Sequence, residues 1–282
     1  MCKAERQGRN VWQKRLEGLC MKKRILLVVA YDGTRYHGWQ VQPNGITIES
    51  ELNRCLSDLL GETIHVSGAS RTDSGVHALG NLAVFDTESR IPGEKFSYAL
   101  NQRLPEDIRI QQSYEVPLDF HPRKTATKKT YEYRIVCAPF PIPTKRLYAH
   151  YTYHDPNVRA MQEAANYLVG EHDFGSFCSV GNQTETTVRT IYDLQVYSEM
   201  AAGVNPSGGK EIVIRVQGNG FLYNMVRIIA GTLLDVGLGR KSPEDIPAII
   251  NACNREEAGP TAPAKGLTLI GYEFVNDIDK TV

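Results

Sequence analysis

KKRILLVVAYDG, at residues 22–33, is the stretch from which the fold of this chain can be worked out. Its centre, residues 25–31, is an unbroken apolar run, a pattern typical of a strand that is covered on both faces. Apolar residues then recur at helical spacing from Leu52 to Leu60, with Thr47 as a candidate N-cap and Gly61 at the end. A strand followed by an amphipathic helix indicates the beginning of an α+β unit.

The patterns further along the chain predict two copies of one order of elements. The first copy continues with strands near 63–69, 80–87 and 107–116 and a helix near 93–103. The second copy has strands near 130–137, 188–199, 211–217 and 267–275, a helix capped by Asp155-Pro156 and stopped by Gly170, a helix over about 221–236 and another from Ser242-Pro243. We therefore predict an α+β fold of two ferredoxin-like β-α-β-β-α-β halves. Joined edge to edge, they would form one mixed, mainly antiparallel sheet with a cleft between them.

The domain boundaries follow from the first strand. Residues 1–20 have neither the apolar run of a secretory signal nor apolar periodicity, and Met21 directly precedes the strand. We expect residues 1–20 to be an N-terminal extension without ordered structure, a short helix being the alternative. Residues 21–120 would form the N-terminal half and residues 121–282 the C-terminal half.

Composition limits the class of protein. Net charge is zero, with 32 Lys+Arg and 32 Asp+Glu, which counts against a generic nucleic-acid binder unless the charges are segregated on one face. No run of 18 apolar residues indicates a membrane span. Six cysteines without a C-x-x-C pair favour a cytoplasmic protein with neither disulfides nor a zinc site.

Residues 68–78, GASRTDSGVHA, form the most informative segment. They place an Arg, an Asp and a His in one tight connection between two predicted strands, and such loops on a rigid scaffold are favoured sites for function. The alternative is an ordinary capped turn, because Thr, Asp, Ser and Gly all favour turns. Dinucleotide, P-loop and H-E-x-x-H motifs are absent from the sequence, so we expect neither a metal nor an organic cofactor.

Five segments in this order resemble the tRNA pseudouridine synthase A family (TruA). Besides residues 68–78 they are YDG with Tyr36, Gly38, Trp39, Gln40 and Gln42, then GEHDF at 170–174, the run 220–227 and AGPTAPAKGL at 258–267. The resemblance covers residues 22–275 and implies an isomerase that converts uridine to pseudouridine at positions 38, 39 and 40 of the tRNA anticodon stem-loop. It also implies tRNA as partner, a homodimer, and no membrane or DNA.

The same resemblance implies the site residues. Asp73, in R-T-D-x-G, corresponds to the catalytic aspartate, and Arg227, in M-V-R, to the arginine beside it. Tyr131 corresponds to the tyrosine that contacts the target base, and Arg71 to the basic residue that assists its extrusion. A carboxylate under a stacked base loses water, so we expect Asp73 and Arg227 to form a direct ion pair.

Purely structural roles for Tyr131 and Arg227 remain possible at this point. Tyr131 could be a cross-strand core aromatic and Arg227 a surface helix residue. Two other function classes also remain. A non-catalytic RNA-binding module would show surface aromatics such as an RNP1 segment, which the sequence lacks. A metal-dependent nuclease or phosphohydrolase would need several convergent carboxylates, whereas residues 68–78 offer one.

Overall fold

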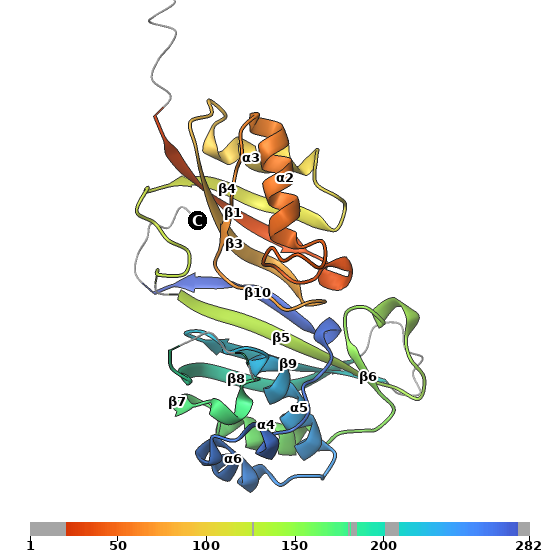
Figure 1. Cartoon of the computed structure of the whole chain (residues 1–282). Coiled ribbons are helices and arrows are strands. Elements are labelled where there is room, and N and C mark those ends of the chain that lie inside the picture. The colour runs from red at the N-terminus through yellow and green to blue at the C-terminus, as the bar shows by residue number, and fades with distance from the viewer. Residues whose placement is uncertain (1–20, 126, 180, 182–184, 201–208, 276–282) are drawn as a thin grey trace, which may run out of the picture.

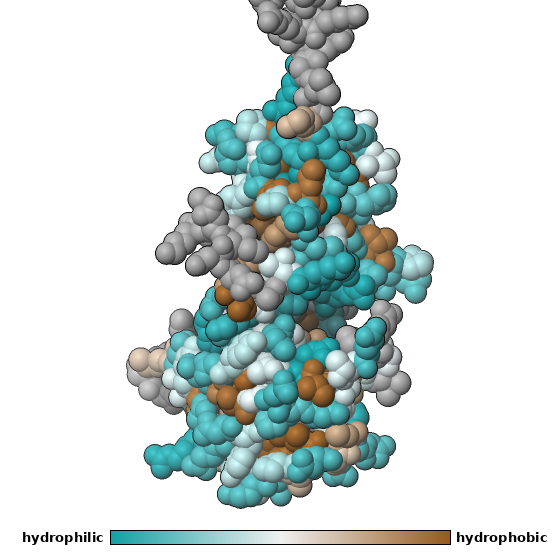
Figure 2. Space-filling view, turned by 90° about the vertical axis from the view of Figure 1, so that its left-hand side faces the viewer, coloured by the Kyte–Doolittle hydropathy of each residue, from teal (hydrophilic) through white to brown (hydrophobic). Residues whose placement is uncertain are grey.

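A computed structural model describes residues 21–125, 127–179, 181, 185–200 and 209–275 (Figure 1). The predicted N-terminal extension, residues 1–20, lies outside the described residues. Among the described residues, no helix is long and apolar enough to cross a membrane. On the face shown in Figure 2, hydrophilic residues predominate and hydrophobic residues occupy small, separate areas.

The elements follow the predicted order. The first half consists of β1 (Lys23–Tyr31), α2 (Ile48–Leu60), β2 (Ser67–Gly68), β3 (His77–Thr87), α3 (Phe96–Asn101) and β4 (Ile108–Val116). The second half consists of β5 (Thr127–Cys137), β6 (His150–Thr152), α4 (Val158–Asn166), β7 (Gly170–Asp173), β8 (Val188–Met200), β9 (Lys210–Gly218), α5 (Met225–Gly237), α6 (Ile246–Ala252) and β10 (Leu267–Phe274).

One mixed, mainly antiparallel sheet of ten strands runs through both halves (Figure 1). The ladder order is β4-β1-β3-β10-β5-β9-β8-β7, with β2 on β3 and β6 on β5. Each half therefore has the ferredoxin-like order, β4-β1-β3-β2 in the first and β10-β5-β9-β8 in the second. The halves meet where β10 pairs in parallel with β3, with Thr268 opposite His77 and Leu269 opposite Ala78. The predicted edge-to-edge α+β fold is confirmed.

The core explains why the first strand is apolar throughout. Ile25, Leu27 and Val29 belong to the large buried cluster that includes the apolar faces of the helices of both halves. Leu26 faces the other side of the sheet and packs in a smaller cluster with Phe120. The prediction of a strand covered on both faces is thus correct.

Several predicted boundaries are wrong. α4 is capped by Asn157, whose side chain accepts a hydrogen bond from the backbone N–H of Ala160 at 3.2 Å, and not by Asp155-Pro156. The helix ends at Asn166, and Gly170 begins β7. β2 is two residues long instead of spanning 63–69. The strands β6 and β7 were not predicted, because such short segments are too short to show an alternating pattern.

The helix predicted from residue 221 begins at Met225. The residue before it, Asn224, has φ 61° and ψ 6°, the left-handed conformation, which interrupts any helix there. Asparagine is one of the few residues with a side chain that tolerates this conformation. The turn at residues 221–224 is therefore not helical, and its side chains face the site described next.

Candidate active site

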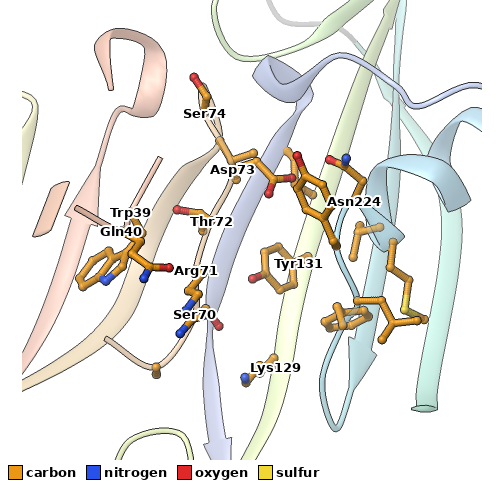
Figure 3. Close-up of a pocket in the computed structure, with 18 of the residues that line it drawn as sticks. Trp39, Gln40, Ser70, Arg71, Thr72, Asp73, Ser74, Lys129, Tyr131 and Asn224 are labelled. Carbon is orange, nitrogen blue, oxygen red and sulfur yellow. The ribbon is translucent and has the colours of Figure 1, made fainter. Parts of the chain in front are cut away.

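A cavity of about 850 Å³ lies where the two halves of the sheet meet (Figure 3). The first half contributes the segments 37–42 and 69–76, and the second contributes residues of β5 and of the turn before α5. The lining residues are His37, Trp39, Gln40, Val41, Gln42, Ala69, Ser70, Arg71, Thr72, Asp73, Ser74, Val76, Arg123, Lys129, Tyr131, Gly181, Phe221, Leu222, Tyr223, Asn224, Met225, Val226 and Leu267. The cavity is thus the predicted cleft between the halves.

Asp73 lies in the connection between β2 and β3, which the neighbouring backbone holds in place. The N–H of Trp39 donates to the carbonyl of Thr72 at 3.0 Å, and the N–H of Val76 donates to the carbonyl of Asp73 at 3.1 Å. Gly38 has φ 80°, and a Cβ there would lie 2.6 Å from the Thr72 oxygen. Only glycine permits this close approach. The loop is therefore a fixed support for the Asp73 side chain.

A buried polar network fixes the start of the same loop. The Asn81 side chain, fully buried on β3, accepts from the N–H of Ser70 at 3.3 Å and donates to its carbonyl at 3.0 Å. The Tyr272 hydroxyl of β10 donates to Asn81 Oδ1 at 2.8 Å and bonds Ser70 Oγ, which lies 2.7 Å away. Asn81 also donates to the Tyr31 hydroxyl at 3.3 Å, and that hydroxyl bonds Thr72 Oγ1 at 2.7 Å. Asn81 therefore joins three strands to the loop.

Asn81→Leu is expected to lower the free energy of unfolding by about 2–4 kcal/mol, since it leaves several buried polar partners without a hydrogen bond. Urea unfolding would measure this. Asn53→Ala is the matched control, because Asn53 Oδ1 accepts a hydrogen bond from the backbone N–H of Val66 at 2.8 Å and the loss should be about 1 kcal/mol. Equal losses in the two variants would contradict the role assigned to Asn81.

Asp73 and Arg227 form the predicted ion pair, although they lie 154 positions apart in the chain. Arg227 Nη1 lies 3.4 Å from Asp73 Oδ2, and the side chains are only 17% and 21% exposed. The contact uses one nitrogen and not two parallel hydrogen bonds. Nε donates instead to the carbonyl of Ala262 at 2.8 Å, and Nη1 also donates to Asn224 Oδ1 at 2.7 Å. Arg227 is thus held from three sides.

The electrostatics of the pair follow the two opposing effects expected from the sequence. Burial raises the pKa of Asp73 above its usual value, because removing water disfavours the charged form. The charge and the hydrogen bond of Arg227 oppose this shift without cancelling it. In Figure 3 the Asp73 side chain points across the cavity toward Asn224, so the carboxylate faces the second half.

Tyr131 lies on the cavity wall beside this pair (Figure 3). It is 8% exposed and packs edge-to-face against Phe221, with ring centroids 5.3 Å apart. Burial raises the pKa of Tyr131 to about 12, so the phenol is neutral near pH 7. Tyr131 is therefore both a core aromatic and a lining residue. Phe221 also lines the cavity.

The structure places the fourth predicted site residue, Arg71, in the same cavity, where it is exposed. Sequence reasoning missed Lys129, Arg123 and Asn224, which also line it. A signal for Lys129 was present, because residues two apart on a strand share a face and Lys129 precedes Tyr131 by two. Among the described lining residues, Arg71, Arg123 and Lys129 are cationic and Asp73 is the one carboxylate.

The family model and the relatives similar in sequence agree with one another. The family described as tRNA pseudouridine synthase matches residues 27–123 and 164–274. The tRNA pseudouridine synthase A of Ruminiclostridium cellulolyticum is 49% identical over 248 residues, 88% of this chain and 98% of that protein. That of Caldicellulosiruptor saccharolyticus is 46% identical over 255 residues, 89% and 100% of the two chains. The solved archaeal box H/ACA sRNP Nop10-Cbf5 complex, at 11% identity, covers 83% of this chain and 60% of that one with a TM-score of 0.31, too low to support an argument.

Proposed function

Because this chain belongs to the tRNA pseudouridine synthase family and is an isomerase that acts on tRNA, we propose that it converts uridine to pseudouridine at positions 38, 39 and 40 of the anticodon stem-loop. We propose Asp73 as the catalytic carboxylate. One observation carries this assignment: Asp73 faces the cavity between the halves while paired with Arg227 from the other half. The homodimer and the cytoplasmic location stay predictions.

Asp73 and Arg227 meet the requirements of this reaction. The reaction breaks the bond between N1 of uracil and C1′ of ribose, rotates the base, and joins C5 to C1′, so nothing is oxidised and no water is consumed. A carboxylate can attack C1′, attack the ring, or remove a proton from the ribose, and each of these roles needs Asp73 ionised. Arg227 keeps the charged form available despite burial, since it opposes the rise in the pKa of Asp73.

The target base must leave its stack to reach Asp73. Flipping a nucleotide out costs a few kcal/mol, and stacking on an aromatic side chain returns about 1–3 kcal/mol. We assign the base contact to Tyr131, whose remaining exposed surface faces the cavity, and assistance of base extrusion to the exposed Arg71. The cost of flipping and the gain from stacking nearly cancel, so contacts with phosphates have to supply the rest of the affinity.

The other two function classes fit the cavity less well. A metal-dependent phosphohydrolase needs several convergent carboxylates, and among the described lining residues Asp73 stands alone. A module that only binds RNA has no need for a carboxylate, because the phosphates of RNA repel it. The carboxylate held in this cavity therefore favours catalysis over binding alone.

Incubating the purified protein with unmodified tRNA transcripts and mapping pseudouridine tests the proposal. We expect conversion at uridines in positions 38, 39 and 40 and none elsewhere in the anticodon arm. Conversion confined to other positions would contradict the proposed site while leaving the family membership intact. Absence of pseudouridine in all transcripts would contradict the proposed activity of this chain.

A further inference from the structure

Lys129 and Tyr131 share one face of β5 and both line the cavity (Figure 3). Two residues along a strand are about 7 Å apart, so Lys129 lies one such step beyond the tyrosine. Its Nζ lies 5.9 Å from the centre of the Tyr272 ring, which stands opposite it on β10. Lys129 therefore marks the end of the cavity away from Asp73.

Positive charge gathers at this end without a carboxylate beside it. Arg123 lines the cavity, and Arg189 of β8 is close enough to lower the pKa of Lys129. Within the described part of the chain, no carboxylate oxygen lies within 4 Å of the charged nitrogens of Lys129, Arg123 or Arg189. Lys129 and Arg189 are half-buried, whereas Arg123 is exposed. A half-buried cation with no carboxylate beside it raises the free energy of the cavity, and an anion that enters would lower it.

Burial and the neighbouring positive charges affect the protonation of Lys129. Burial lowers the pKa of Lys129 to about 8, and the charges of Arg189 and Arg123 add to the effect. The other titratable groups that face Lys129 do not change their charge in this pH range. Tyr131 has a pKa of about 12, and burial raises the pKa of Tyr272 well above its usual value. Lys129 is thus the group among these whose charge changes between neutral and mildly alkaline pH.

We propose that Lys129, together with Arg123, forms a subsite for a phosphodiester group of the RNA strand, adjacent to the nucleotide whose base contacts Tyr131. This inference rests on the proposed function, since an RNA substrate carries one phosphate for each nucleotide. Lysine and arginine form charge-assisted hydrogen bonds with phosphate oxygens. The subsite would hold the strand while the base lies deeper in the cavity.

The subsite gives RNA binding a pH dependence of known sign. A bound phosphate raises the pKa of Lys129, so binding takes up a proton when the free protein is above its pKa of about 8. Affinity from this contact is complete below that pH and falls as the pH rises through it. Arginine at the same position stays protonated throughout and removes this step.

The test measures Kd for a fluorescently labelled unmodified tRNA transcript about one pH unit below and one above the pKa of Lys129. Lys129→Met is expected to weaken binding about tenfold at the lower pH and to reduce the slope of log affinity against log salt by about 0.7. Lys129→Arg should bind as the wild type does at the lower pH and lose less affinity at the higher pH.

Lys128→Met is the matched control, because it removes the same charge one residue away. Lys128 points to the opposite face of β5, with its Nζ 5.2 Å from the centre of the Tyr192 ring. We expect less than about a twofold change in its Kd, within the scatter of surface substitutions. Urea unfolding of each variant separates a lost contact from a lost fold.

Two results would overturn the subsite. One is equal weakening by Lys129→Met and Lys128→Met. The other is the same pH dependence of Kd in wild type and Lys129→Arg. Pseudouridine formation by the wild type is measured in parallel. If it is absent, the proposed function is wrong; if it is present and KM is unchanged in Lys129→Met, only the subsite is wrong.

Discussion

Asp73→Asn is expected to lower the rate of uridine isomerisation about a thousandfold or more while the Kd for tRNA changes less than about threefold. Asparagine has nearly the same size as aspartate, but its amide neither attacks carbon nor takes a proton at neutral pH. The loop itself should survive, because its backbone hydrogen bonds to Trp39 and Val76 do not involve the carboxylate. Single-turnover pseudouridine formation and a binding titration would measure both quantities.

Ser74→Ala controls for damage to the loop. Ser74 follows Asp73 directly, and its hydroxyl donates to the carbonyl of Tyr36 at 3.2 Å. The control should keep a rate within about threefold of the wild type, as expected of a surface substitution. An Asp73→Asn variant that retains a tenth of the wild-type rate would remove Asp73 from the chemistry.

Arg227→Met should lower the rate about a hundredfold or more, with Arg227→Lys recovering only part of it. Arg227 reaches Ala262, Asn224 and Asp73 with a planar fork that a single ammonium group does not reproduce. Because the pair is partly exposed, the loss in unfolding free energy should be about 1–2 kcal/mol, less than the roughly 2.7 kcal/mol that a hundredfold loss of rate represents. Rates and urea unfolding of both variants would separate these effects.

The pH profile tests whether Arg227 acts through Asp73. Arg227 lowers the pKa of Asp73 against the effect of burial, so Arg227→Met should raise that pKa further. The rate that depends on ionised Asp73 is present above this pKa and lost as the pH falls through it. The acidic limb should therefore move to higher pH in the variant. An acidic limb at the same pH in the variant and the wild type would mean that Arg227 has a structural role and does not act through Asp73.

The periodicity of the sequence was enough to predict the fold but not its finer boundaries. The apolar run of β1 and the spaced leucines of α2 specify local structure directly, since both faces of the strand and one face of the helix are buried. The start of α5 depends instead on Asn224, whose amide is held by Arg227 and by Ser179 at 3.0 Å. Ser179 is 45 positions away in the chain, so no local pattern indicates where this helix begins.

The site residues likewise divide into those that could be predicted from the sequence and those that could not. Asp73 and Arg227 could be named because motifs around them resemble a known family, and the ion pair could be expected from electrostatics. Asn81 could not, because a single polar residue in an apolar strand does not tell which loop it bonds. For Lys129 the only signal in the sequence was its spacing of two residues from Tyr131. That no carboxylate of the described residues pairs with Lys129 is visible only once the neighbouring strands are in place.

The position of β10 has a consequence for synthesis on the ribosome. β10 is the last strand of the described chain, yet it lies between β3 and β5 at the middle of the sheet. Chains fold from the N-terminal domain first as they emerge, and pairings between distant residues form slowly. Both halves must therefore wait with an open edge until residues 267–274 leave the exit tunnel. A message cut short before this strand therefore yields a chain in which, among the described strands, nothing pairs β3 with β5.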